Sequence, residues 1–350
     1  MAGFLKNMWY RSLLEKDVLP DFIIRYGIRR LLAGRLKAEN KGNPEAQQQH
    51  FMKLLAELKA SPIAVNTEDA NAQHYEIPAD FFQLVMGKHL KYSSGYWKEG
   101  VTSIDVSEND MLEITCERAE LKDGQNILEL GCGWGSLSLF MAAKFPNSKI
   151  TSVSNSHSQK AFIDGQAQQR GIKNLTIITA DMNVFQIAEK FDKVISIEMF
   201  EHMRNYDLLM NKVANFLKPE GKLFVHIFTH KDYAYKFEVI DDSDWMSKYF
   251  FTGGIMPSDH LLLYFQNELK IQQHWRVSGT HYEKTSNAWL QNMDLHKAEI
   301  MKIMERVYGK QDALKWWSYW RIFFISCAEL WGYKGGKEWM VSHYLFQKAT

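Results

Sequence analysis

Apolar and polar positions alternate regularly between residues 120 and 228 of this chain. Short apolar runs with the length of buried strands stand at 126–131, 149–155, 175–180, 193–197 and 222–228. Stretches whose apolar positions are spaced for helices stand at 136–145, 158–171 and 201–217. Strands that alternate with helices of this length are typical of a parallel, doubly wound sheet, so the pattern predicts an α/β fold.

The chain before this region has a different pattern. Residues 4–60 place leucine and isoleucine near a 3.6-residue period, which predicts helices, and Pro20 interrupts the first helix or starts the second. The basic amphipathic stretch 25–37 fits either a membrane surface or a helical cap packed on the main domain, and we favour the cap. Residues 61–73 have the polar composition of a linker.

The chain after residue 228 mixes aromatic helical stretches with two further strand candidates, at 271–279 and 339–348. We expect two units, an N-terminal helical cap over 1–70 and a cofactor-binding domain over 71–350. Within the second unit, we expect insertions at about 229–265 and 280–335 to cover the substrate.

Composition narrows the class of protein. The chain has 42 Lys and Arg against 41 Asp and Glu, a balance that argues against a nucleic-acid-binding protein. Cys116, Cys132 and Cys327 are far apart without a CxxC pair, so neither a disulfide framework nor a zinc site is indicated. The 11 Trp, 15 Tyr and 21 Phe suit a large core or an apolar ligand pocket.

Nothing in the sequence indicates a membrane segment or an export signal. No apolar run of about 18 residues is present. Residues 1–17 carry charges where a signal peptide has its apolar core. We therefore expect a soluble protein of the cytoplasm.

A glycine-rich turn follows the first predicted strand, in the stretch ELGCGWGS at 129–136. Glycines allow a ligand to approach the backbone, and the helix behind them offers free N–H groups. The turn departs from the nicotinamide fingerprint, because its third glycine comes one residue early and the second strand ends without an acid. S-adenosylmethionine fits this turn better than a nicotinamide dinucleotide does. Asp181, after the third strand, would then accept a hydrogen bond from adenine, or it is a helix cap.

The stretch SIEMFEHM at 196–203 holds two carboxylates and an imidazole at the end of the fourth predicted strand. If it is helical, its spacing places Glu198, Glu201 and His202 on one face. Ligands of open α/β sheets bind at the carboxyl ends of the strands, so we expect these three side chains to face the transferable methyl group.

With these features, the chain resembles the coclaurine N-methyltransferase group of plant alkaloid enzymes, in the cyclopropane fatty acid synthase superfamily. The resemblance covers nearly the whole chain. It rests on stretches such as VLPDFIIRYGIRRLLAGRL, HYEIPADFF, LKYSSGYW, ILELGCGWGSLSL, SNSHSQKAFI, SIEMFEHMRNYDLL, FVHIFTHKDYAYKFE and WMVSHYLF. It implies a Rossmann-like class I methyltransferase with a mostly parallel seven-stranded sheet and a helical cap. It also implies a catalytic site shaped by Glu76, Glu201 and His202, with Glu198 beside them.

The resemblance extends to the synthases of this superfamily, which hold a bicarbonate ion in their catalytic site. The resemblance places Ser94 and Phe228 where those enzymes have a Cys and an Ile. Glu201, His226 and Tyr282 keep the synthase residue types. The two replacements favour an amine acceptor, with methylene or methyl transfer to an unsaturated lipid as the alternative. A S-adenosylmethionine-binding scaffold without activity is a third hypothesis, against which the intact Glu201–His202 pair argues.

In this hypothesis His202 is the general base, while Glu76 and Glu201 orient the amine. We expect a small-molecule amine as partner, no nucleic acid and no metal, with membrane contact only under the lipid alternative; a homodimer is left open. The expected cofactor contacts are Tyr92, Ser93, Glu129, Gly131, Gly133, Gly135, Ser154, Asn155, Gln159, Asp181, Met182 and Glu198. The expected acceptor pocket is formed by Ser94, His226, Phe228, Phe251, Tyr282, Tyr319, Trp320 and Phe323.

Overall fold

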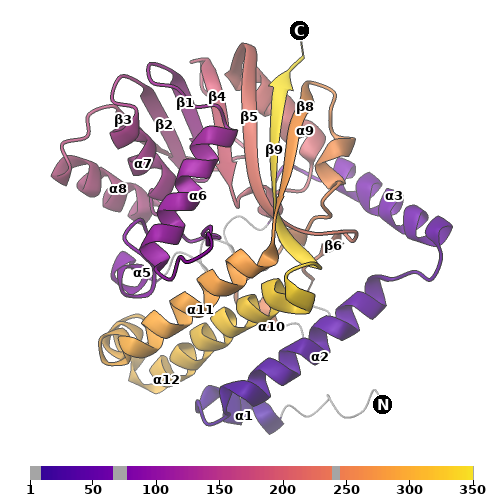
Figure 1. Cartoon of the computed structure of the whole chain (residues 1–350), viewed down its shortest axis with the longest axis vertical. Coiled ribbons are helices and arrows are strands. Elements are labelled where there is room, and N and C mark those ends of the chain that lie inside the picture. Colours follow the sequence, from indigo (N-terminus) through magenta and orange to yellow (C-terminus); the bar gives the residue numbers. More distant parts are fainter. Residues whose placement is uncertain (1–8, 66–76, 239–244, 350) are drawn as a thin grey trace.

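A seven-stranded sheet forms the centre of the computed structural model, which describes residues 9–65, 77–238 and 245–349 (Figure 1). The strand order is β3-β2-β1-β4-β5-β9-β8. The first five strands in the chain pair in parallel, while β9 pairs antiparallel with both β5 and β8. The mostly parallel seven-stranded sheet is therefore confirmed. Its strands are β1 (Asn126–Leu130), β2 (Lys149–Ser154), β3 (Leu175–Thr179), β4 (Phe191–Ile197), β5 (Leu217–His230), β8 (Leu269–Val277) and β9 (Trp339–Lys348).

Helices cover both faces of the sheet. On one face, α6 (Ile104–Arg118) and α7 (Ser136–Lys144) bury their apolar side chains against β1, β2, β4, β5 and β9, and α8 (His157–Gln169) packs beside them on β3. On the other face, α9 (Tyr206–Phe216) and α3 (Pro44–Ala60) share a second apolar core with the sheet. This two-sided covering explains why the central strands are apolar on both faces.

A third layer of helices crosses the carboxyl ends of the parallel strands, below the sheet in Figure 1. It consists of α11 (Gly279–Leu295) and the long α12 (Lys297–Gly332), which bends at Gly309. Their aromatic side chains form one buried cluster with α5 (Ala79–Val85) and α10 (Trp245–Tyr249). This layer closes the end of the sheet at which ligands bind in such folds.

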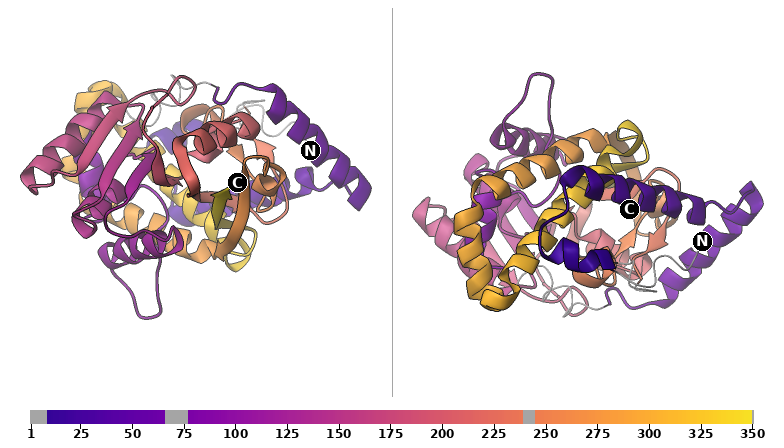
Figure 2. Two further views of the ribbon diagram at one scale, coloured as in Figure 1. Left: turned by 90° about the horizontal axis from the view of Figure 1, so that it is seen from above. Right: turned by 90° about the horizontal axis from the view of Figure 1, so that it is seen from below.

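The N-terminal helices pack along this third layer (Figure 2). Besides α1 (Trp9–Glu15), they include α2 (Asp21–Glu39), whose Arg25 donates to Glu329 and Asn287 at 2.9 Å. The division of the chain at residue 70, and the insertions at 229–265 and 280–335, stay predictions. None of the helices in the described ranges has the length and apolarity that crossing a membrane requires.

Shorter elements connect these layers. The 3₁₀ helices are η1 (Phe200–His202), η2 (Leu261–Tyr264) and η3 (Tyr333–Gly335), and a small two-stranded sheet joins β6 (Tyr235–Lys236) to β7 (Ile255–Met256).

The helix predicted over 201–217 differs from the structure. The chain forms η1 and then breaks, because the Asn205 side chain accepts from the Leu208 N–H at 3.1 Å and starts α9 at Tyr206. Glu198 lies outside both helices with a φ of 46°. The three chemically important side chains of this stretch therefore do not share one helix face.

The turn before α7 generates a test of the fold. Gly135 has a φ of 80°, and a Cβ there would lie 2.7 Å from the Ile163 side chain. We expect Gly135→Ala to lower the free energy of unfolding by at least about 1–2 kcal/mol, because the left-handed backbone and the contact both oppose a side chain.

Gly165 in α8 provides the matched control, because a Cβ there meets nothing within 4 Å. Gly165→Ala should stabilise the helix by about 1 kcal/mol. Urea unfolding measures both variants, and equal stability of Gly135→Ala and wild type would contradict the assigned geometry.

Candidate active site

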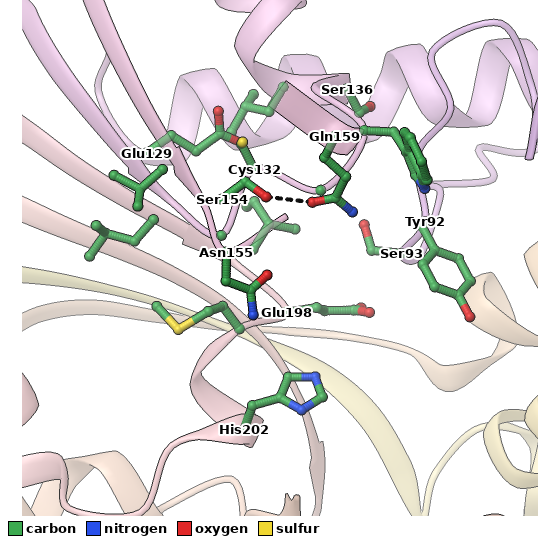
Figure 3. Close-up of a pocket in the computed structure, with 18 of the residues that line it drawn as sticks. Tyr92, Ser93, Glu129, Cys132, Ser136, Ser154, Asn155, Gln159, Glu198 and His202 are labelled. Atoms are coloured by element: carbon green, nitrogen blue, oxygen red, sulfur yellow. Dashed lines mark hydrogen bonds between the residues drawn. The ribbon is translucent and has the colours of Figure 1, made fainter. Parts of the chain in front are cut away.

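A cavity of about 180 Å³ lies at the carboxyl ends of β1, β2 and β4 (Figure 3). Loop residues 90–93, the glycine turn, the end of β2, the residues just before η1 and His202 at the end of η1 form its walls. Of the residues predicted for the cofactor or for catalysis, the cavity is lined by Tyr92, Ser93, Glu129, Gly131, Gly133, Ser154, Asn155, Gln159, Met182, Glu198 and His202. The sheet thus brings together residues separated by more than 100 positions in the chain.

The cavity wall offers unused hydrogen-bonding groups. Trp134 Nε1, Ser136 Oγ and Gln159 Nε2 are buried and have no hydrogen-bond partner among the described residues, although all three residues line the cavity. Gly133 has a φ of 52°, and no atom lies within 4 Å of where its Cβ would be. Unpaired buried donors beside an open glycine backbone indicate a polar ligand. These residues fit the carboxylate, hydroxyl and adenine groups of S-adenosylmethionine.

Gln159 is held in place for such a role. Its Oε1 accepts from the Ser154 hydroxyl at 2.6 Å, which leaves the Nε2 group turned toward the cavity (Figure 3). The Ser154 oxygen in turn accepts from the Ser156 N–H at 3.0 Å. The end of β2 and the start of α8 therefore fix one donor of the cavity.

Two buried charged groups flank the cavity. Burial raises the pKa of Glu129 to about 7, although hydroxyls of Ser138 and Ser152 donate to its carboxylate. Burial lowers the pKa of Lys91 to about 8, while Glu198 and Glu108 act to raise it. Lys91 was not predicted as a site residue, although it directly precedes the predicted Tyr92 and Ser93.

Asp181 and Gly135 do not line the cavity. The Asp181 carboxylate accepts from the Asn183 N–H at 2.6 Å, as a turn-capping residue does. Gly135 lies behind the turn, against Ile163. Contact of either residue with the cofactor stays a prediction.

Glu198 is the most constrained residue of the site. Its Oε1 lies 3.2 Å from His226 Nε2, and its Oε2 accepts from the Tyr282 hydroxyl at 2.8 Å. Burial raises the pKa of Glu198 to about 7, whereas Lys91, Tyr282 and the backbone N–H of Ser94 act to lower it. A non-glycine residue in the left-handed region is strained, and here the surrounding hydrogen bonds hold that strain in place.

Glu201 and His202 follow on η1 and differ in exposure. Glu201 is 1% exposed, and its Oε2 has no hydrogen-bond partner within the described part of the chain. Burial and then the charge of Glu198 raise the pKa of Glu201 well above its usual range. His202 lines the cavity, and its ring centre lies 4.7 Å from that of Phe251. Glu76, also predicted here, lies outside the described residues.

Aromatic rings connect His202 to Glu198 in an unbroken series of contacts, which we term the aromatic arc. Phe251 contacts Phe228 with ring centres 5.6 Å apart, and Phe228 contacts Trp331 at 5.4 Å. Trp331 stacks on Tyr282 at 4.8 Å, and Tyr282 donates to Glu198. Trp331 was not predicted as part of the site, because the many aromatic residues of this region give no local indication of which ones contact its residues.

The other predicted pocket residues lie elsewhere. Trp320 is fully buried among Phe81, Phe250 and Phe324, and the Tyr319 hydroxyl donates to Glu15 of α1 at 2.9 Å. Phe323 stacks on Phe250 with ring centres 4.6 Å apart. These three side chains belong to the same buried aromatic cluster as Phe228 and Tyr282, and none of the eight residues predicted for the acceptor pocket lines the described cavity. Their contact with an acceptor stays a prediction.

Ser94 and the histidines of β5 complete the site. Ser94 is fully buried, and its hydroxyl donates to the Gly95 carbonyl at 2.9 Å, while its backbone faces Glu198. His226 points to Glu198, whereas His230 accepts from the Tyr233 N–H at 2.8 Å. Over the described ranges, no group of three His, Cys, Asp or Glu side chains is arranged to hold a metal ion.

Comparison with known proteins agrees with this geometry. The family model described as mycolic acid cyclopropane synthetase matches residues 64–331. The chain is 39% identical to an (S)-coclaurine N-methyltransferase from Thalictrum flavum subsp. glaucum over 96% of this chain and 94% of that protein. A cyclopropane-fatty-acyl-phospholipid synthase from Escherichia coli K12 is 30% identical, over 62% of this chain and 54% of that protein.

A solved structure is similar over the full fold. The crystal structure of coclaurine N-methyltransferase bound to N-methylheliamine and SAH superimposes with a TM-score of 0.94 at 39% identity, covering 97% of this chain and 98% of that one. The similarity thus spans the sheet, the third helical layer and the N-terminal helices. The chain therefore belongs to the mycolic acid cyclopropane synthetase family and, within it, to the coclaurine N-methyltransferase group of S-adenosylmethionine-dependent methyltransferases.

Proposed function

We propose that this enzyme methylates the nitrogen of a small ring amine of the alkaloid type. The observation that carries the proposal is the position of Glu198, whose carboxylate is hydrogen-bonded to His226 and Tyr282. In the lipid-modifying synthases of the superfamily, the resemblance assigns this histidine and this tyrosine to a bicarbonate ion. In this protein, the Glu198 carboxylate is hydrogen-bonded to both of these residues.

A second anion at this place is unfavourable. Burial, and then the charge of Glu198, raise the pKa of Glu201, so one carboxylate makes the ionisation of its neighbour harder. Adding bicarbonate beside them would place a further anion in the same buried site. A cationic amine has the opposite effect, because it relieves the repulsion between the two carboxylates. The site therefore favours an ammonium-forming acceptor over a lipid double bond.

The acceptor has to arrive with a free electron pair. An aliphatic amine with a pKa near 10 is mostly protonated at pH 7, and removing its proton there costs about 4 kcal/mol. In our proposal Glu201 and Glu198 attract and orient the cation, and Glu76 adds to them. His202 accepts the proton, directly or through a water molecule, because imidazole has a pKa close to working pH.

The aromatic arc suits the same acceptor. Phe251 contacts both His202 and Phe228, and in our proposal its ring takes the flat acceptor and attracts its cation through the π electrons. S-adenosylmethionine, when bound, supplies an electrophilic methyl group. The chain contributes by holding the nitrogen in line with that group and by excluding water from it. Relatives named for coclaurine and pavine support an alkaloid-type ring amine.

One incubation separates the amine acceptor from the lipid alternative. The enzyme is given methyl-labelled S-adenosylmethionine, a panel of tetrahydroisoquinolines and other amines, and vesicles of unsaturated phospholipid, with and without added bicarbonate. We expect label in the amines alone, at a rate that does not change when bicarbonate is removed. Label in the lipid fraction, or a rate that depends on bicarbonate, would contradict the proposal.

The role of His202 predicts the effect of its removal. His202→Ala should lower kcat/KM for the amine by about 10²–10⁴-fold, because the proton acceptor is lost. Affinity for S-adenosylhomocysteine, measured by calorimetry, should stay near the wild-type value. His157→Ala, at the exposed start of α8, is the control and should keep full activity.

Full turnover by His202→Ala would mean that another group accepts the proton of the amine. If Glu201→Gln then abolished turnover while His202→Ala did not, the buried carboxylate with the raised pKa would be the base instead.

The aromatic arc predicts a selective effect of one glycine. A Cβ on Gly254 would lie 2.0 Å from a ring atom of Phe251, so the ring has to move. We expect Gly254→Ala to raise KM for the amine several-fold while leaving S-adenosylhomocysteine affinity unchanged. Steady-state kinetics measures the change, and Gly34→Ala in α2, where a Cβ meets nothing within 4 Å, is the control. An unchanged KM would argue against Phe251 as part of the acceptor pocket.

A further inference from the structure

Glu198 is the inner end of a hydrogen-bonded chain of side chains that runs away from the cavity. From Glu198 Oε1 it passes to His226 Nε2 at 3.2 Å, and from His226 Nδ1 to His343 Nε2 at 2.9 Å. It ends at Arg118, whose Nη1 lies 2.8 Å from His343 Nδ1. His226 on β5 and His343 on β9 are directly paired in the sheet, and Arg118 is the last residue of α6.

Arg118 sets the direction of every hydrogen bond in this chain. A guanidinium group has donors and no acceptor, so His343 Nδ1 must accept. A neutral imidazole that accepts at one nitrogen carries its proton on the other, so His343 Nε2–H donates to His226 Nδ1. By the same reasoning, His226 Nε2–H donates to Glu198. This series of hydrogen bonds ends at the Arg118 guanidinium, which does not lose its proton. The series therefore fixes the orientation of the two imidazoles and does not conduct protons away from the cavity.

The surroundings keep both imidazoles neutral and in place. His226 and His343 are each 0% exposed, and burial first, then neighbouring basic groups, lower the pKa of both well below the usual range. The Phe224 ring packs on His343 with centres 5.1 Å apart, and the Arg118 guanidinium lies 5.1 Å from the centre of the Trp275 ring. The ring packing and the stacked cation leave little freedom to rearrange.

We propose that Arg118 and His343 are positioning residues which, acting through His226, keep an N–H group directed at the Glu198 carboxylate. Without Arg118, the proton of His343 can move to Nδ1 and that of His226 can follow. His226 would then turn a lone pair toward Glu198, which disfavours the charged carboxylate. The inference rests on the proposed function only in giving Glu198 a role in amine binding.

Other groups also face Glu198, but none of them replaces the N–H group that His226 directs at it. Tyr282 of α11 donates a hydroxyl, Lys91 contributes positive charge, and the Ser94 N–H donates from the backbone. Glu201 on η1 and Cys327 on α12 also interact with the Glu198 charge. Of the hydrogen-bonding neighbours given by the described residues, His226 is the one whose facing atom changes from donor to acceptor with its tautomer.

The tautomers are measured directly by ¹⁵N NMR of protein labelled at histidine. We expect the wild type and Arg118→Lys, which retains a donor, to show neutral rings protonated at Nε2 for both His226 and His343. Arg118→Met should show Nδ1-protonated or mixed tautomers at both. Assignment uses His226→Gln and His343→Gln. Unchanged Nε2 tautomers in folded Arg118→Met would overturn the proposal, and this readout does not depend on which acceptor is methylated.

The consequence for the reaction is measured by the pH profile of kcat/KM. His343→Leu, which breaks the chain, should shift the rising acidic limb to higher pH by about one unit, equivalent to about a tenfold lower kcat/KM on that limb. His343→Gln can accept from Arg118 and donate to His226, so it should restore the wild-type profile. Arg118→Met provides a second break if His343→Leu does not fold.

These profiles also separate the two proposals. A wild-type enzyme that methylates no amine would contradict the proposed function. The tautomers of His226 and His343 measured by NMR would still test the role of Arg118 and His343. An active enzyme in which His343→Leu and His343→Gln share the wild-type profile would overturn the positioning role alone.

Discussion

A carboxylate buried at the end of a central strand is the constraint on which this active site depends. A charged group in such a place is costly unless donors surround it, and Glu198 receives them from β5, α11 and the loop before α6. Its backbone φ of 46° is held by the same contacts. The long β5, the third helical layer and the position of η1 all serve to place these donors within reach of one side chain.

This constraint connects the two halves of the site. The cofactor cavity is formed by the parallel strands, as expected of an open α/β sheet, with unpaired donors on Trp134, Ser136 and Gln159. The aromatic arc comes from the third layer and from β5, and it meets the cavity at Glu198 and His202. In the proposed function, Glu198 takes the place that the resemblance gives to the bicarbonate ion of the lipid-modifying synthases, because it is hydrogen-bonded to His226 and Tyr282.

The strands were predictable, because buried parallel strands are short apolar runs and their carboxyl ends collect the polar ligand-binding residues. The break between η1 and α9 was not predictable, since it arises from the Asn205 cap and from the hydrogen bonds that Asn205 donates to the Lys59 and Ser61 carbonyls at the end of α3. Composition indicated an aromatic pocket but did not indicate which rings contact His202, as Phe251 does, and which pack wholly in the core, as Trp320 does. His343 and Arg118 carry no local signal, because the pairing of β5 with β9 brings His343 beside His226 and the end of α6 places Arg118 against His343.

The central claim is that Glu198 occupies the place of a separate anion and leaves the acceptor site to a cation. A crystal structure of the enzyme with S-adenosylhomocysteine and a methylated ring amine, grown in bicarbonate-containing buffer, tests it most directly. We expect Glu198 to be hydrogen-bonded to His226 and Tyr282 with no bicarbonate between them, and the amine nitrogen to lie within hydrogen-bonding distance of Glu201 or His202. Bicarbonate bound to His226 and Tyr282, with Glu198 displaced, would contradict it.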